Sequence, residues 1–260
     1  LLIATKIKDK KIEAKSLLYI AYYYENINDY RNSLIYYLKS LDIYKILNDD
    51  IKIAELYNYI GNSYEYLGDF ELAHKNYLIS LSKYEVLNNK EGIAYSNNDI
   101  GNLYYAHENY DFAKRYFEDA LEIYVRLENK SGIAVCYTNI GNVTSDAGMN
   151  LEGIDYFFRS VEIEEELEDF VGIGVNFNNI GDCYLNVEKF DNAELYFKKA
   201  LNIADEIGDE ELRAIVYLNL SDLNNKIHNY WEAINYGEKS LEISKRIGII
   251  ECISLYISCG

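Results

Sequence analysis

Apolar residues along the chain recur at spacings of three and four, which is the period of one face of an α-helix. Within residues 91–127 they form two blocks: Ile93, Ala94, Ile100, Leu103 and Tyr104, then Ala113, Tyr116, Phe117, Ala120, Leu121 and Tyr124. Charged residues fill the opposite face of the second block. No stretch alternates with a period of two, so the pattern predicts pairs of amphipathic helices and no strands.

This pair of blocks repeats every 40 residues. The motif Ile100-Gly101-Asn102 has close copies at 60–62, 140–142 and 180–182, and weaker ones at 220–222 and 20–21. Short segments rich in Asn, Asp and Gly, which suit turns and caps, separate the blocks. We therefore expect helices near 11–28, 30–47, 51–67, 70–87, 91–107, 110–127, 131–147, 150–167, 171–187, 190–207, 210–227 and 230–247.

Glycine recurs inside the first helix of four repeats, at Gly61, Gly101, Gly141 and Gly181. Glycine in a helix interior costs about 1 kcal/mol relative to alanine, so a repeated glycine needs a reason. We expect a large aromatic side chain of the second helix to lie against each glycine backbone. The candidates are Tyr77, Phe117, Phe157 and Phe197.

These positions resemble the tetratricopeptide repeat family. The small residue of its first helix matches the four glycines, and its following aromatic residue matches Tyr64, Tyr104 and Tyr184. Its second-helix alanine matches Ala73, Ala113, Ala193 and Ala233. The resemblance implies an all-α fold, a right-handed α-solenoid of antiparallel helix pairs with about six repeats and partial repeats at both ends. It also implies protein or peptide binding in a groove lined by the first helices.

The chain departs from the usual family pattern in length and in its lack of proline. A 40-residue period is closer to the repeats of kinesin light chains, spindle-orientation adaptors and bacterial signalling proteins. Repeat four is weak because Thr144, Asn150 and Gly153 replace packing residues, and repeat six carries Ser221, Asn224 and Gly237 at key positions. We expect repeat four to be the least stable part of the array.

The unbroken period predicts one domain over residues 1–260. The chain begins and ends within the pattern, since Leu1–Ile7 aligns with the end of a second helix and Ile249–Gly260 with the start of a first helix. We therefore expect a fragment of a longer protein. Hydrophobic residues make up 49% of the chain, which is too many for a disordered segment.

The net charge of −18 disfavours nucleic acid and anionic membrane surfaces as partners. The four cysteines, Cys136, Cys183, Cys252 and Cys259, form no metal or redox spacing, so we expect reduced thiols in a cytoplasmic protein. The three histidines lie far apart, and no nucleophile elbow or phosphate-binding loop is present. We expect no enzyme, no cofactor and no metal. The acidic run Glu162–Asp169 is expected on a solvated helix face.

Candidate binding residues lie on the first helices as pairs spaced by four, so that each pair shares one helix face. They are Asn58 and Asn62, Asn98 and Asn102, Thr138 and Asn142, and Asn178 and Asp182. An asparagine amide both donates and accepts, which matches an extended peptide backbone. Alternatively, these amides join neighbouring helices and hold the pitch of the solenoid.

The residues at the groove positions are acidic, namely Glu55, Glu65, Asp99, Asp146, Asp182 and Asp222, with Lys226 as the basic exception. This favours a neutral to basic peptide or protein segment. Most of the 28 tyrosines are expected in the core, but Tyr59, Tyr66, Tyr95 and Tyr105 fall at groove positions, and Tyr105 joins the candidate binding set. The alternative function is self-association of a larger signalling protein.

Overall fold

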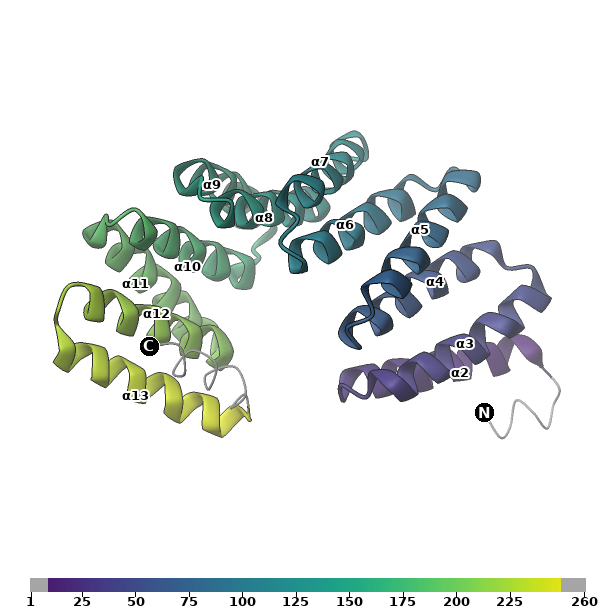
Figure 1. Cartoon of the computed structure of the whole chain (residues 1–260), viewed down its shortest axis with the longest axis horizontal. Coiled ribbons are helices and arrows are strands. Elements are labelled where there is room, and N and C mark those ends of the chain that lie inside the picture. The colour runs from purple at the N-terminus through teal and green to yellow at the C-terminus, as the bar shows by residue number, and fades with distance from the viewer. Residues whose placement is uncertain (1–8, 249–260) are drawn as a thin grey trace. The chain divides into compact units, whose positions relative to one another are not determined.

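The computed structural model describes residues 9–248, which form twelve α-helices and no strand over that range (Figure 1). The helices form six pairs: α2 (Lys10–Asn26) and α3 (Tyr30–Leu47), α4 (Asp50–Tyr66) and α5 (Phe70–Val86), α6 (Lys90–Ala106) and α7 (Tyr110–Arg126), α8 (Lys130–Asp146) and α9 (Asn150–Leu167), α10 (Phe170–Asn186) and α11 (Phe190–Ile207), and α12 (Glu210–Lys226) and α13 (Tyr230–Ile247). The two helices of each pair pack against each other. The predicted all-α solenoid is confirmed, and each helix boundary lies within two residues of its prediction.

The contacts divide the chain into two units, residues 1–128 and 129–260, and each is described by itself. Unit 1 contains α2 to α7 and unit 2 contains α8 to α13. A single domain therefore stays a prediction. The helical segments expected in Leu1–Ile7 and Ile249–Gly260, together with Cys252 and Cys259, lie outside the described residues.

The helix ends follow a period of 20 residues. A residue with positive φ follows each described helix: Asn28, Asn48, Gly68, Asn88, Glu108, Glu128, Gly148, Glu168, Glu188, Gly208, His228 and Gly248. At Gly68 the backbone N–H donates to Glu65 O at 2.9 Å, and the N–H of Asp69 donates to Tyr64 O at 2.9 Å, which satisfies carbonyls at the helix end. Asp69 then caps α5 by accepting from the N–H of Leu72. Side-chain caps also precede the first helices, at Asp9, Asp49, Asn89, Asn129, Asp169 and Asp209. Five of the six described first helices begin one residue earlier than predicted, and α12 begins at Glu210 as predicted.

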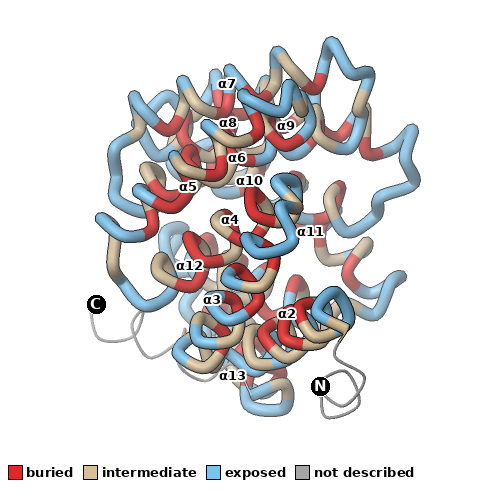
Figure 2. Tube along the Cα trace, turned by 90° about the vertical axis from the view of Figure 1, so that its right-hand side faces the viewer, coloured by how far each residue is buried: buried red, intermediate tan, exposed pale blue. Residues whose placement is uncertain are grey.

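The glycine positions of the first helices lie directly under aromatic rings. A Cβ atom built on Gly61 or Gly181 would lie 2.5 Å from the ring of Tyr77 or Phe197, and one on Gly101 or Gly141 would lie 2.6 Å from Phe117 or Phe157. All four rings are fully buried. The predicted close approach is confirmed, and it interlocks the two helices of each of these four pairs. Each helix thus carries one buried stripe and one exposed stripe (Figure 2).

The expectation that the acidic run Glu162–Asp169 is solvated is wrong for one member. Glu162, Glu165 and Glu166 are exposed, but Glu164 is buried on the inner side of α9, with 5% of its surface exposed. Its carboxylate accepts from Asn176 Nδ2 on α10, at 2.9 Å to each oxygen. A partner on the next helix therefore holds this carboxylate inside the unit.

Candidate functional site

The candidate asparagines lie on a surface built by the first helices within each unit. First helices of neighbouring repeats contact each other, α4 with α6 in unit 1, and α8 with α10 and α10 with α12 in unit 2. We call these surfaces, at the asparagine positions, the first-helix surface of each unit. Amides spaced by 40 residues in the sequence therefore come to lie on adjacent helices.

In unit 2 some of these amides bind each other. Asn179 Nδ2 donates to Asn142 Oδ1 at 3.1 Å, and Asn219 Nδ2 donates to Asn178 Oδ1 at 2.9 Å. Asn178 is buried and Asn142 is half-buried. The donors Asn179 and Asn219 were not among the predicted residues, although both sit next to a predicted position in the repeat. These bonds join helices in the way that the alternative reading of the asparagines expects.

Thr138 belongs to a polar network between α8, α9 and α10. Its Oγ1 lies 3.0 Å from Ser160 Oγ and 3.0 Å from Asn176 Nδ2. Ser160 and Asn176 both bind the Glu164 carboxylate. Burial raises the pKa of Glu164, whereas the hydrogen bonds from Asn176 and Ser160 oppose this rise. The network turns Thr138 towards the interior of unit 2.

In unit 1 the same repeat positions as Asn178 and Asn219 carry Asn58 and Asp99. Asn58 is 1% exposed and lies beside the Asp99 carboxylate, outside hydrogen-bonding geometry. Both polar atoms of the Asn58 amide and Oδ2 of Asp99 are buried and have no hydrogen-bond partner among the described residues. Burial raises the pKa of Asp99 to about 7, although the Asn58 amide opposes the rise. A carboxylate thus replaces an amide donor and leaves this pair unsatisfied.

The remaining predicted residues are accessible to different degrees. Asn62 Oδ1 lies 2.7 Å from the Tyr77 hydroxyl, and Asp182 is exposed and accepts from Asn186 at 3.3 Å. Asn102 is half-buried and makes no side-chain hydrogen bond to any described residue. Asn98 and Tyr105 are half-buried as well. These side chains remain within reach of a ligand on the first-helix surface.

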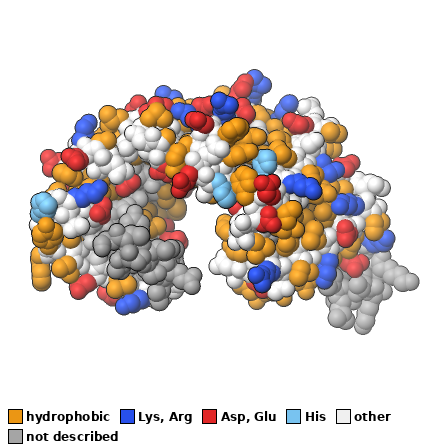
Figure 3. Space-filling model, viewed as in Figure 1, with side chains coloured by type: hydrophobic (Ala, Val, Ile, Leu, Met, Phe, Trp, Pro, Cys, Tyr) orange, Lys and Arg blue, Asp and Glu red, His pale blue; other side chains and the backbone are white. Residues whose placement is uncertain are grey.

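Two carboxyl groups of the first-helix surfaces, one in each unit, have raised pKa values. Burial raises the pKa of Glu65 in unit 1, and the Tyr77 hydroxyl, 2.5 Å from its carboxylate, opposes that rise. In unit 2, desolvation by the surrounding protein raises the pKa of Asp182 although its side chain is partly exposed, and the positive charge of Lys226 opposes this rise. In Figure 3, acidic side chains are interspersed with hydrophobic and basic ones, with no continuous basic area among the described residues on the face drawn.

Two cavities in unit 1 add to this picture. One of about 300 Å³ is lined by tyrosines and glutamates of α4 to α7, including Glu55, Tyr59 and Tyr95. The sequence predicts these three at groove positions, whereas the other lining tyrosines, Tyr84 and Tyr124, fall among those expected in the core. Tyr84 and Tyr124 could have been identified by their shared position in the repeat, because they are 40 residues apart and each lies near the end of a second helix.

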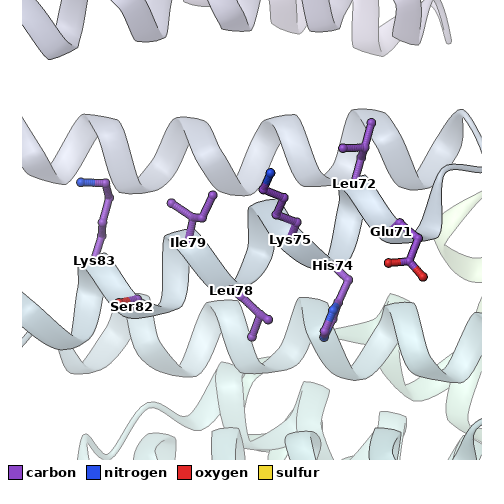
Figure 4. A pocket seen from close by; sticks show the side chains of 8 residues that line it. All are labelled: Glu71, Leu72, His74, Lys75, Leu78, Ile79, Ser82 and Lys83. Atoms are coloured by element: carbon purple, nitrogen blue, oxygen red, sulfur yellow. The ribbon is translucent and has the colours of Figure 1, made fainter.

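The larger cavity, of about 670 Å³, runs along α5 and involves none of the predicted residues. Figure 4 shows Leu72, Lys75, Ile79 and Lys83 on one side of this helix and His74 and Leu78 on the other. Leu72 and Leu78 are 36% and 39% exposed. This is therefore a partly apolar surface on a second helix.

Over residues 9–248, no group of three or more His, Cys, Asp and Glu side chains is arranged to hold a metal ion. His74 instead lies 3.1 Å from the Tyr104 hydroxyl. Cys136 and Cys183 are buried free thiols, and burial raises the pKa of each to about 12. None of the described helices has the length and apolar character that crossing a membrane requires.

A sequence model of the tetratricopeptide repeat matches residues 52–126 and 173–246, together more than half of the chain. No curated protein shows a significant sequence match.

Among solved structures, BtubC (BKLC) from P. vanneervenii is 17% identical, with a TM-score of 0.73 over 84% of this chain and 92% of that chain. Aspartyl phosphate phosphatase F from Bacillus subtilis is 15% identical, with a TM-score of 0.75 over 93% and 73%. The Rap conjugation gene regulator of the plasmid pLS20, in complex with the Phr* peptide, is 15% identical, with a TM-score of 0.68 over 95% and 78%. At these identities the likeness shows the fold alone.

Proposed function

Because the chain belongs to the tetratricopeptide repeat family, we propose that it is a binding module that holds an extended peptide or protein segment against its first helices. The observation that carries the proposal is the presence, within each unit, of partly accessible amides on first helices that contact a neighbouring first helix: Asn62, Asn98 and Asn102 in unit 1, and Asn142 in unit 2. An extended backbone presents donors and acceptors at regular intervals, which such amides match. The similar Rap regulator bound to the Phr* peptide supports this reading.

The proposed site has two layers. The residues that contact a ligand are Asn62, Asn98, Asn102 and Tyr105 in unit 1, and Asn142 and Asp182 in unit 2. Asn58, Thr138 and Asn178 lie behind them and set the spacing of the helices, because each is buried or turned into a polar network. In this arrangement, bracing and binding are mostly functions of different amides, and Asn142, which accepts from Asn179 and is half-buried, takes part in both.

The negative charge of the first-helix surface determines which peptide segments it favours. The acidic side chains at these positions favour lysine or arginine in a neutral to basic segment, so added salt weakens this part of the binding. The role proposed is binding without catalysis or cofactor, in a cytoplasmic signalling protein.

The test uses a peptide selected from a random peptide library and the double variant Asn102→Ala with Asn142→Ala. Each lost hydrogen bond is worth about 1 kcal/mol, or roughly fivefold in affinity, so the double variant binds at least tenfold more weakly. The melting temperature falls by about 2–4 °C at most, because the double variant loses the hydrogen bond from Asn179 to Asn142. The matched control is Asn202→Ala, an exposed asparagine on the second helix α11, which leaves affinity unchanged. A folded double variant with full affinity overturns the proposal.

Self-association is a second candidate, and the partly apolar surface along α5 favours it. Two copies that pair through this surface bury Leu72 and Leu78. The molar mass from light scattering then rises with concentration, and Leu72→Glu with Leu78→Glu abolishes the rise. A monomer whose mass is independent of concentration eliminates this candidate.

A further inference from the structure

The 300 Å³ cavity of unit 1 combines four tyrosines with two glutamates, and we call it the tyrosine cavity. Tyr59 comes from α4, Tyr84 from the end of α5, Tyr95 from α6 and Tyr124 from the end of α7. Glu55 precedes Tyr59 by one helical turn, and Glu91 precedes Tyr95 by one turn. Aromatic rings from four helices therefore line the cavity, and on both α4 and α6 a carboxylate shares the helix face of the lining tyrosine.

Packing holds two of these rings in place. The Tyr84 ring lies over Gly92, where an added Cβ atom would come within 2.3 Å of the ring. The Tyr59 ring stacks on Tyr37, with centroids 5.4 Å apart and planes at 20°. Tyr84 and Tyr124 are buried, whereas Tyr95 is 42% exposed and forms the accessible wall. The cavity thus exists before a ligand arrives.

The electrostatic field in the cavity favours a cation. The faces of aromatic rings are negative, and a cation within about 6 Å of a ring centroid is attracted. Burial raises the pKa of Tyr84, and the carboxylates of Glu55 and Asp99 raise it further. Lys52 Nζ already pairs with Glu55 at 2.5 Å. Glu91 is exposed and makes no ion pair with a described residue, so its charge is available.

We propose that the tyrosine cavity receives an arginine side chain of the bound segment. The planar guanidinium stacks on the tyrosine faces and forms an ion pair with Glu91. Arginine fits better than lysine because guanidinium is planar and weakly hydrated, whereas an ammonium group is compact and strongly hydrated. This inference rests on the proposed binding of an extended segment and assigns one side chain of that segment to a defined cavity.

The test uses three acetylated and amidated peptides, Gly-Ala-X-Ala-Gly, in which X is arginine, citrulline or lysine. Citrulline has nearly the shape of arginine without its charge. The backbone amide of Gly92, in the cavity wall, reports binding by NMR titration. The arginine peptide shifts this signal in a saturable manner, with an affinity at least about fivefold higher than that of the citrulline peptide. The lysine peptide binds more weakly than the arginine peptide.

Two variants and two matched controls complete the test. Tyr95→Leu and Glu91→Gln each reduce the arginine-to-citrulline affinity ratio. Tyr23→Leu, at a tyrosine of α2 that is 60% exposed, and Glu71→Gln, in the first turn of α5, leave the ratio unchanged. If Tyr95→Leu fails to fold, Glu91→Gln decides alone, since its side chain is exposed. An unchanged ratio in folded variants, or equal binding of arginine and citrulline, overturns the proposal.

The two proposals fail in different ways. Asn102→Ala with Asn142→Ala weakens the selected library peptide through its backbone, whereas the cavity variants alter only the preference for arginine. If the chain still binds the backbone of a peptide but shows no preference for arginine, the arginine site in the tyrosine cavity is rejected and the proposed peptide binding is kept. Tighter binding of a trimethyllysine peptide than of the arginine peptide would also overturn the assignment, because the cavity would then select a quaternary ammonium group.

Discussion

Tyr84 in unit 1 and Glu164 in unit 2 occupy the same position of the repeat, at the end of a second helix and beside a glycine of the next first helix. Both side chains are 5% exposed. The Tyr84 ring lies over Gly92, whereas Glu164 Oε1 lies 2.6 Å from the point where Gly172 would carry a Cβ atom. We call the space against this glycine the slot. At one position of the repeat, the slot therefore accepts either an aromatic ring or a carboxylate.

A second residue of the next first helix changes together with the side chain that fills the slot. In unit 1, Ser96 lies 3.3 Å from Ser80 and offers the ring no polar contact of its own. In unit 2 the same position carries Asn176, whose Nδ2 donates to both oxygens of Glu164. Apolar burial stabilises the first slot, and hydrogen bonding compensates for the desolvation of the carboxylate in the second.

The largest expected effect comes from emptying the aromatic slot. Tyr84→Ala should lower the free energy of unfolding by about 3–5 kcal/mol, because it removes a buried ring and leaves a cavity. Urea denaturation measures the change. Tyr23→Ala, at an exposed tyrosine of the same unit, should cost less than about 1 kcal/mol. Equal costs would show that the ring does not contribute through burial.

Removing the donor in unit 2 should have the next largest effect. Asn176→Ala should cost about 2–3 kcal/mol, because it leaves the buried Glu164 carboxylate short of two hydrogen bonds. Ser96→Ala at the same position in unit 1 should cost about 1 kcal/mol. A loss in unit 2 no larger than that in unit 1 would contradict the polar compensation of Glu164.

The rate of local opening should also differ between repeat four, which contains Glu164, and repeat three. The Thr144 hydroxyl is buried without a hydrogen-bond partner among the described residues, whereas the Tyr104 hydroxyl lies 3.1 Å from His74. We therefore expect amide hydrogen exchange across residues 144–153 to be about tenfold faster than across 104–113. Slower or equal exchange there would remove repeat four as the weak point.

The smallest effect concerns pH. Burial raises the pKa of Glu164 above its unfolded value, so the folded state retains this proton to higher pH than the unfolded state does. The resulting stabilisation is present below the unfolded pKa and is lost as pH rises through the folded pKa. The stability of Glu164→Gln relative to the parent chain should therefore increase as the pH rises from about 4 to about 7. Glu162→Gln, at an exposed neighbour, should show no such trend in thermal denaturation.

The helices, their 40-residue period and the contacts between glycine and aromatic residues were predictable from the sequence. Each depends on residues close together in the chain or at one repeated spacing. Asp69 caps its own helix, and the ring of Phe117 reaches Gly101 across a single turn between paired helices. The placement of the candidate asparagines on the first helices was also predictable, because residues spaced by four stay on the same face of a helix. Their role in binding a ligand stays a prediction.

Only the tertiary structure determined which polar side chains are buried and which hydrogen-bond partners they find. Glu164 lies in an acidic run, and its burial depends on Asn176 and Gly172 of the next helix. Asn178 finds a donor in Asn219, whereas Asn58 at the same position meets Asp99 and stays unpaired. The tyrosine cavity likewise needs four helices to bring its rings together. Local sequence sets which way a side chain points, but its environment is set by the adjacent helix, 12 to 41 residues away in the chain.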